Sequence, residues 1–557
     1  MKKLAIGLSD YKELIEDDCY YVDKTLLIKE LLSHKDKVTL LCRPRRFGKT
    51  LNLSMLKYFF EKTEESNVHI FADKKIWQHQ EIQKEQGSHP VIFITFKDVK
   101  EDNFEKTYNN LALLISKEFK RHWPILSSKL DEYDLKVYKE ILNKSADIIT
   151  LGDSIYFLSN LLREHYNKKV IVLIDEYDTP IHAAYMNNYY KQATEFIKGL
   201  LGKVLKDNVS LERSVLTGIL RTAKEGIFSD LNNLKVCTIL SDNYSDKFGF
   251  TTNEVFDLLK YKNLESQMDD IKYWYNGYHA GENTLIYNPW SILECIRENG
   301  KLMRYWVNTS NNKLISKLLI KANDNVKKEL EDLLNDISIT KSIDEGFTFE
   351  DIEHNESALW SLFLFSGYMT YQNRQVTSSG VYSCSLVLPN HEIKELYKNF
   401  IELTLTQALG SMATVKIMLD AMISGNITVF EELLQNFIIN SMSFYDISDK
   451  EPEKSYHMFI LGLLILLSDS YEVKSNRESG YGRYDIMLIP KDKSNNGIII
   501  EFKKAGANAL ESVVEDALLQ IDEKQYSQEL NRQSIQNIIV YGIAFKGKKI
   551  LVKSKKL

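Results

Sequence analysis

The sequence has little cysteine and little proline. Its five cysteines, in 557 residues, are scattered and form no CxxC pair, which argues against a disulfide framework and against a zinc knuckle. It has only eight prolines, and its shares of apolar residues (44%) and charged residues (27%) are those of ordinary globular proteins, so long disordered stretches are not expected. We therefore expect a chain that folds throughout and resides in a reducing cytoplasm.

The sequence also lacks a membrane-spanning run and a strong net charge. The longest apolar run, 458–467, is interrupted by Gly462 and is too short to cross a bilayer, so no membrane association is expected. The formal net charge of -6 gives no overall attraction for nucleic acid, so any such contact must come from a local patch. One candidate is 546–556, with six lysines and no acid, although a solvated, fraying tail is the favoured interpretation.

A chain of this length is expected to fold as several domains. In 1–250, short apolar strands at 38–42, 91–96, 170–174 and 214–220 alternate with helix-length segments, which is typical of an α/β fold with a parallel sheet. A mainly helical region is expected at 251–340. A mixed connecting region, with a winged-helix-like arrangement as one option, follows at 341–450, and a second α/β domain at 451–557.

Aromatic residues are concentrated in the helical region, at 274–279, 287–290 and 305–306. Such clusters usually pack a surface between domains, and the alternative is that they hold a nucleotide base. We favour packing.

A phosphate-binding loop is indicated after the first strand. Gly48 allows the backbone to turn sharply, so that the amides at the start of the following helix face a phosphate. Lys49 supplies a cation and Thr50 a hydroxyl for magnesium. The usual pattern opens with a glycine where this chain has Arg43, and Arg45 and Arg46 either add guanidinium groups to the cradle or face solvent. The predicted nucleotide-binding residues of the loop are Arg43, Arg45, Arg46, Phe47, Gly48, Lys49 and Thr50.

A second part of this site follows the strand at 170–174. Asp175 and Glu176 come directly after it, where a parallel sheet delivers its ligands. Asp175 is expected to hold magnesium through water, and Glu176 to polarise the attacking water. Beyond the strand at 214–220, Arg221 either senses the γ-phosphate or makes a structural ion pair, and the two alternatives are equally weighted.

Several segments of the first 310 residues or so resemble one family. RPRRFGKTLNLSML, LIDEYDTPI, LTGILRTAKEGIFSDLNNL, DYKELIEDDCYYVDKTLLIKELL, WYNGY and YNPWSIL are similar to the bacterial AAA-ATPase-like family, which commonly carries a C-terminal PD-(D/E)XK nuclease-superfamily domain. Within that family, Arg43 is no departure from the loop. The resemblance implies ATP with Mg²⁺ as ligand, with Lys49 and Thr50 at the phosphates, Asp175 and Glu176 at the metal and water, and Asp23 and Lys24 near the nucleotide entrance.

Acidic and basic residues also mark the last domain. Alternation along the strand at 497–503 puts Glu501 and Lys503 on one face, and Asp485 belongs to a neighbouring strand. Two charges on a buried strand are costly unless they meet a metal or each other, which is the physical argument for a site. The alternative is an edge strand with a solvent-facing Glu-Lys pair.

The order of elements around these residues resembles the PD-(D/E)XK nuclease fold. SYHMFILGLL, SNRESGYGRYDIMLIP, IIIEFKK and ALLQIDEKQY carry the resemblance. It implies that Asp485 and Glu501 bind Mg²⁺, with Mn²⁺ as an alternative, and that Lys503 assists the water or the scissile phosphate. Gln520 resembles a helix-borne glutamine of related exonuclease-like proteins. Tyr526 follows Gln520 too distantly for the tight pairing of those proteins and is left outside the predicted site.

The function expected from the sequence joins both halves. We expect a protein that binds and hydrolyses ATP and whose metal-dependent nuclease-type domain acts on DNA or RNA. One alternative is a nucleotide-dependent switch whose C-terminal domain binds nucleic acid or protein without cleavage, and another is an ATPase that remodels protein. A homo-oligomer is a further option, because P-loop ATPases often complete a site with an arginine from a neighbour.

Overall fold

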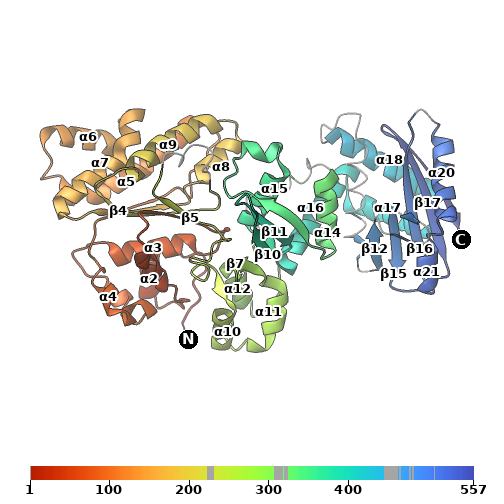
Figure 1. Cartoon of the computed structure of the whole chain (residues 1–557), viewed down its shortest axis with the longest axis horizontal. Coiled ribbons are helices and arrows are strands. Elements are labelled where there is room, and N and C mark those ends of the chain that lie inside the picture. Colours follow the sequence, from red (N-terminus) through yellow and green to blue (C-terminus); the bar gives the residue numbers. More distant parts are fainter. Residues whose placement is uncertain are drawn as a thin grey trace. The chain divides into compact units, whose positions relative to one another are not determined.

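In the computed structural model, the chain forms two compact units (Figure 1). Unit 1 comprises Met1–Asn308 and Ser338–Ile393, and unit 2 comprises Thr309–Ile337 and Lys394–Leu557. The structure describes residues 2–221, 231–306, 318, 324–444, 462, 466–468, 470–475, 478–479, 482–483, 485–506 and 509–557.

Unit 1 is built on a parallel sheet of five strands in the order β2-β3-β4-β1-β5. The strands are β1 (Val38–Cys42), β2 (Val91–Thr95), β3 (Val170–Asp175), β4 (Leu211–Gly218) and β5 (Leu234–Cys237). In Figure 1, α5 (Phe104–Leu126), α7 (Ile148–Tyr166) and α9 (Tyr190–Leu205) cover one face, and α2 (Leu26–Ser33) and α3 (Lys49–Phe60) the other. The predicted α/β class is confirmed, and four of the five strands were expected.

The strands inside this sheet are the most deeply buried ones. Every residue of β1 and β3 is buried, as expected for strands covered by helices on both faces. Because β1, β3 and β4 are neighbours and run in parallel, their carboxyl ends meet at one edge. The loops that leave this edge carry the residues predicted to bind nucleotide.

The region after the first sheet is helical with three short strands that the sequence did not predict. Its helices are α10 (Thr252–Tyr261), α11 (Met268–Tyr275) and α12 (Pro289–Arg297), and its strands β6 (Phe250–Thr251), β7 (Tyr278–Ala280) and β8 (Thr284–Tyr287) pair in the order β6-β8-β7. Thr251 and Glu254 form a capping box at the start of α10.

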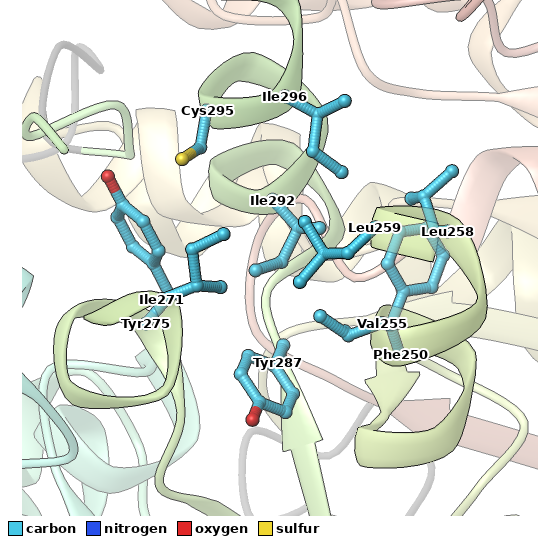
Figure 2. Close-up of a cluster of buried hydrophobic side chains, with 10 residues drawn as sticks. All are labelled: Phe250, Val255, Leu258, Leu259, Ile271, Tyr275, Tyr287, Ile292, Cys295 and Ile296. Carbon is cyan, nitrogen blue, oxygen red and sulfur yellow. The ribbon is translucent and has the colours of Figure 1, made fainter. Parts of the chain in front are cut away.

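The core of this region is a cluster of buried side chains, shown in Figure 2. Tyr275 and Tyr287 belong to this cluster, and Trp274 and Tyr305 pack against it. The preference for packing is therefore correct for these aromatics. They pack in the core of the region itself, and the Trp274 ring also lies 4.5 Å from the ring of His391, which is outside the region.

Unit 1 also contains a smaller antiparallel sheet in the order β10-β11-β9. Its strands are β9 (Ile339–Ile343), β10 (Thr370–Val376) and β11 (Tyr382–Val387), and α15 (Glu356–Ser366) contacts β9. Helix α16 (His391–Leu409) begins in unit 1 and continues into unit 2.

Unit 2 contains a mixed sheet in the order β12-β15-β16-β17-β18. Its strands are β12 (Tyr471–Ser475), β15 (Ile486–Pro490), β16 (Gly497–Lys504), β17 (Ile538–Lys546) and β18 (Lys549–Lys556), and only the β16–β17 pair is parallel. Helix α20 (Leu510–Glu523) covers one face, and α17 (Met412–Ser424) and α18 (Ile427–Phe444) lie on the other (Figure 1).

Two neighbouring residues of β17 show how the faces differ. The Tyr541 hydroxyl points toward α17 and donates a hydrogen bond of 2.6 Å to the Met422 carbonyl. Gly542 faces α20, where an added Cβ would lie 2.7 Å from the Val514 carbonyl oxygen. Glycine is required there because the helix backbone approaches the strand closely.

The lysine-rich C-terminal segment is a strand, so the expected fraying tail is wrong. β18 pairs along its length with β17, and Ile550 and Val552 are buried. Lys555 forms a 3.0 Å ion pair with Asp522 of α20, and Lys553 one with Glu515. Ile550 and Val552 are two residues apart, as expected for the buried face of a strand, but lysines dominate the composition of the segment, so composition alone did not indicate a strand.

The helices α17 and α18 are separated by Gly425, which adopts a left-handed conformation (φ +84°). The apolar run at 458–467 lies outside the described residues, apart from isolated positions. Within the described part of the chain, no helix has the length and apolar character needed to cross a membrane.

Candidate nucleotide site and carboxylate site

The loop between β1 and α3 opens into a pocket of about 300 Å³. Gly48 caps α3 in a left-handed conformation, with φ +84°, which costs glycine little. Gly48, Lys49 and Thr50 line the pocket at the start of this helix. The first amides of a helix have no partner within it, so this end of the pocket suits an anion.

Lys49 is held at the base of the loop. Its side chain is 4% exposed, and its ammonium donates to the carbonyls of Arg43 (3.1 Å) and Pro44 (3.0 Å). Burial lowers the pKa of Lys49, while the nearby carboxylates, foremost Glu176, act in the opposite direction. An ammonium has three N–H donors, so one remains for a phosphate oxygen.

Asp175 lies at the point where three strands converge. Its buried carboxylate accepts hydrogen bonds from the hydroxyls of Thr50 (2.8 Å), Thr95 (3.0 Å) and Thr217 (2.7 Å). Burial raises the pKa of Asp175, and these hydroxyl groups oppose the shift. The structure thus brings Thr50 and Asp175, both predicted magnesium ligands, into direct contact.

Glu176 follows in a left-handed conformation (φ +49°) and lines the pocket. Its backbone amide donates to the Thr217 hydroxyl (3.3 Å), and one carboxylate oxygen accepts from the Thr179 hydroxyl (3.2 Å). A residue other than glycine adopts this backbone conformation at a cost. The turn presents the Glu176 side chain to the same pocket as Lys49.

The Arg43 side chain does not reach this pocket. Its guanidinium is fully buried and donates to the carbonyls of Cys42 (2.8 Å), Cys237 (3.0 Å) and Tyr244 (3.0 Å). Arg43 therefore ties the end of β1 to β5 and to the following loop. A glycine at this position could make none of these hydrogen bonds. Arg43 therefore has a structural role in the loop.

The other two arginines of the loop differ from each other. Arg46 lines the pocket, and its guanidinium lies 3.8 Å from the centre of the Trp290 ring. Burial lowers the pKa of Arg46, against the opposing charges of Glu294 and Glu392. The Arg45 carbonyl accepts a hydrogen bond of 3.3 Å from Asn288, and its side chain is not among the described lining residues.

Phe47 lies between the loop and the helical region. Its ring is buried and packs edge-to-face on Tyr278, with 5.2 Å between ring centres. Its carbonyl accepts a 3.1 Å hydrogen bond from the Gly249 amide. Phe47 is therefore one of the residues that form the wall of the pocket.

Arg221 lies just beyond β4, next to residues 222–230, which the structure does not describe. It is not among the described lining residues of the pocket. The preceding turn is held by Asp178, a residue that sequence reasoning missed: its buried carboxylate accepts from the amides of Ile219 (2.7 Å) and Leu220 (3.0 Å). The sequence does contain a sign of this residue, because Asp178 is the third acidic residue of the segment IDEYD at the end of β3.

The two residues expected near the nucleotide entrance lie apart. Lys24 lines the pocket and pairs with Glu254 at 2.6 Å. Asp23 is not among the lining residues described, and its carboxylate instead accepts from the backbone amides of Thr25 (2.9 Å) and Lys75 (2.8 Å).

In unit 2, the predicted acids converge from neighbouring strands. Asp485 directly precedes β15 and accepts a 2.7 Å hydrogen bond from the Phe502 amide of β16. Glu501 is 4% exposed, and β16 is the central strand of its sheet. The alternative of an edge strand with a solvent-facing Glu501 is therefore wrong.

Burial dominates the electrostatics of this pair. It raises the pKa of Asp485 to about 6 and that of Glu501 to about 8, and the negative charge of Asp485 adds to the second shift. Lys503 partly opposes both shifts, so its ammonium acts on the same centre. Three of the predicted residues therefore form one electrostatic unit.

Gln520 and Tyr526 complete the surroundings of Glu501. The Gln520 amide donates to one Glu501 carboxylate oxygen and to the Tyr526 hydroxyl (3.2 Å). The other Glu501 oxygen is buried and has no hydrogen-bond partner among the described residues. Sequence spacing left Tyr526 out, but α20 ends at Glu523 and Gln525 turns the chain (φ +53°), which returns Tyr526 to Gln520.

The donor set fits a hard divalent cation. A buried carboxylate oxygen without a partner is costly, and Asp485 offers a second carboxylate beside it. Oxygen ligands of this kind suit Mg²⁺ and Mn²⁺. Asp485 and Glu501 are the residues that would hold the ion.

Comparison with known proteins yields a match for each end of the chain. Residues 5–228 match a family model described as "Predicted AAA-ATPase", and residues 451–555 match the model of the PD-(D/E)XK nuclease superfamily. A relative described as "Uncharacterized protein in vnfD 5'region", from Azotobacter chroococcum mcd 1, is 27% identical over 404 residues, which cover 71% of this chain and 68% of the relative. The chain thus carries an N-terminal domain of the AAA-ATPase-like family and a C-terminal domain of the PD-(D/E)XK nuclease superfamily, as its sequence motifs predicted.

Proposed function

We propose that this protein binds and hydrolyses ATP in unit 1 and cleaves phosphodiesters of DNA or RNA in unit 2 with the help of a divalent metal ion. The observation that carries the proposal is the buried pair of Asp485 and Glu501, with one carboxylate oxygen left without a partner. Such a pair is expensive in a protein core unless a cation binds it.

In unit 1, each residue at the edge of the parallel sheet has a distinct task. Lys49 directs its remaining N–H to a phosphate oxygen, and Thr50 and Asp175 would hold Mg²⁺. When bound, the ion neutralises charge between the β- and γ-phosphates. Glu176 accepts a hydrogen bond from the attacking water and orients it.

In unit 2, Asp485 and Glu501 would hold Mg²⁺ or Mn²⁺, which when bound polarises the scissile phosphate and lowers the pKa of water. Lys503 provides positive charge for the phosphate or the attacking water. Gln520 fixes the orientation of Glu501, and Tyr526 fixes Gln520. Support of this kind keeps a metal ligand in one rotamer.

The test compares Lys49→Ala with Glu501→Ala. ATP hydrolysis and cleavage of single- and double-stranded DNA and RNA are measured with Mg²⁺ or Mn²⁺. We expect Lys49→Ala to abolish hydrolysis, and Glu501→Ala to abolish cleavage while ATP binding persists. Exposed residues of the same types supply the controls Lys84→Ala and Glu523→Ala, which should behave as wild type. Cleavage that survives in Glu501→Ala would refute the nuclease assignment.

One observation favours a second candidate, a nucleotide-dependent switch whose C-terminal domain binds nucleic acid or protein without cleavage. The pKa of Glu501 is raised to about 8, so at neutral pH a proton competes with a metal ion. Cleavage assays with Mn²⁺ from pH 6 to 9 separate the two functions. No cleavage at any pH, together with retained nucleic-acid binding, supports the switch.

A further inference from the structure

Two aromatic segments contact the phosphate-binding loop from outside the parallel sheet. The Arg46 guanidinium lies 3.8 Å from the centre of the Trp290 ring at the start of α12. The Arg45 carbonyl accepts hydrogen bonds from the Asn288 side-chain amide (3.3 Å) and from the Trp306 indole N–H (3.4 Å). The start of α12 and the segment at 305–306 therefore hold the same stretch of the loop.

Glu392, in the first turn of α16, joins these two segments. It is 2% exposed, and its carboxylate accepts hydrogen bonds from the Ser291 hydroxyl of α12 (2.8 Å) and from the backbone amides of Tyr305 (2.6 Å) and Trp306 (2.7 Å). Burial raises the pKa of Glu392 to about 7, and these donors and the charge of Arg46 oppose the shift. Because its three donors come from both segments, the carboxylate moves together with them.

The start of α16 is anchored in the same region. The His391 ring stacks on Tyr273 (4.9 Å between ring centres) and packs edge-to-face on Trp274 (4.5 Å), both in α11. Gly277 follows α11 with φ +110°, and an added Cβ would clash with the Pro389 carbonyl oxygen, so glycine is required there. Helices α11 and α12 share the core shown in Figure 2, so the first turn of α16 packs on the same body as the loop.

We propose that Glu392 is a positioning residue, which holds Arg46 and the Arg45 carbonyl in place for the phosphates and links nucleotide binding to the first turn of α16. The proposal rests on the proposed binding of triphosphate at this loop. Arg46 lines the pocket, and a guanidinium binds phosphate oxygens through paired hydrogen bonds. Trp290 directly precedes Ser291 in α12, so a shift of the stack on Trp290 also acts on the hydrogen bond to Glu392.

Helix α16 continues from unit 1 into unit 2, so its first turn is where a change in unit 1 enters that helix. Coupling between two sites is reciprocal, so a change that shifts the first turn of α16 alters nucleotide affinity by the same factor. These contacts also give a task to the aromatic segments at 274–279, 287–290 and 305–306, which phosphate binding alone does not explain.

Calorimetry of ATP binding to the full chain tests the positioning role. Glu392→Ala removes the acceptor of three donors and should weaken ATP about tenfold. Glu392→Gln keeps an oxygen for the two backbone amides and should bind ATP within about threefold of the wild type. Glu298→Ala is the matched control, because this acid lies exposed at the end of α12, and it should bind ATP as the wild type does.

Hydrogen exchange of the amides at 391–400, with and without a non-hydrolysable ATP analogue, tests the link to α16. In the wild type, the analogue should slow exchange there about threefold or more. In Glu392→Ala saturated with the analogue, exchange at 391–400 should equal that of the nucleotide-free variant. A merely structural role of Glu392 would change exchange equally in both states and would leave the effect of the analogue intact.

Two results would overturn the inference. One is slower exchange in the wild-type phosphate-binding loop without any change at 391–400, and the other is ATP affinity that Glu392→Ala leaves unchanged. If Glu392→Ala does not fold, Ser291→Ala decides, because it removes one donor and should weaken ATP by a smaller factor, and unchanged affinity there overturns the inference. Absence of nucleotide binding in the wild type would refute the proposed function itself, which the other results leave intact.

Discussion

At the scale of the residue, the two sites differ in what surrounds their buried carboxylates: hydroxyl groups surround Asp175, whereas one oxygen of Glu501 has no hydrogen-bond partner among the described residues. Strand alternation placed Glu501 and Lys503 on one face, and Asp485 was assigned to a neighbouring strand, whereas Gln520 was predicted from the resemblance to related exonuclease-like proteins. Tyr526 was left out because a turn after α20, and not helical spacing, brings it to Gln520. The burial of the Arg43 side chain could not be predicted either, because the Cys237 and Tyr244 carbonyls that it contacts are far away in the sequence.

Metal binding in unit 2 should depend on pH. Burial raises the pKa of Asp485 to about 6 and that of Glu501 to about 8, above the values in an unfolded chain. The stability that these protonated groups contribute is fully present below about pH 4 and is lost as pH rises through 6 and 8. Metal binding needs the deprotonated forms, so affinity for Mn²⁺ should rise over this range, with roughly one proton released at pH 7.

Calorimetry of Mn²⁺ binding in buffers of different ionisation enthalpy measures that release. The variant Glu501→Gln provides the control, since it has no carboxyl proton to lose at this position. Affinity that is the same at pH 6 and pH 9 in the wild type would contradict the assignment of these carboxyl groups as ligands.

Arg43→Ala distinguishes a structural arginine from one that binds nucleotide. It leaves three buried carbonyl groups without their donor, so we expect a loss of about 2–4 kcal/mol in the free energy of unfolding. ATP affinity of the folded fraction should change little. Denaturant unfolding and ATP titration measure the two effects. A variant as stable as wild type but unable to bind ATP would show that Arg43 contacts the ligand.

At the scale of the element, continuous apolar strands were predictable and short or mixed ones were not. β1 and β3 are apolar throughout and buried, so their sequences identify them. β5 escaped prediction because only one of its four residues, Cys237, is buried. β18 escaped because its lysines outnumber its apolar residues, and pairing with β17 decides its structure.

The packing of α20 on β17 can be tested at Gly542. In Gly542→Ala, the new Cβ would meet the Val514 carbonyl at 2.7 Å, so the helix must move away from the strand. We expect a loss of about 1–3 kcal/mol in the free energy of unfolding. Gly152→Ala is the matched control, since nothing lies within 4 Å of its added Cβ, and it should be neutral or stabilising. Equal stability of the two variants in urea unfolding would contradict this packing.

At the scale of the whole molecule, one chain carries two sheets, and each sheet has a group of buried carboxylates at or beside its strands. In unit 1, the carboxyl edge of a parallel sheet gathers Lys49, Thr50 and Asp175 beside a pocket. In unit 2, the central strand of a mixed sheet carries Glu501 beside Asp485. The two centres use carboxylates differently, because Asp175 is surrounded by hydroxyl groups and Glu501 keeps an oxygen without a partner.

We predict that both centres bind a divalent ion. The most direct measurement is a crystal structure of the full chain with Mn²⁺ and a non-hydrolysable ATP analogue, in which anomalous scattering locates the metal. We expect one peak beside Thr50 and Asp175 and a second between Asp485 and Glu501. A map with full occupancy of the first position and no density at the second, at pH 8 or above, would contradict the account of unit 2.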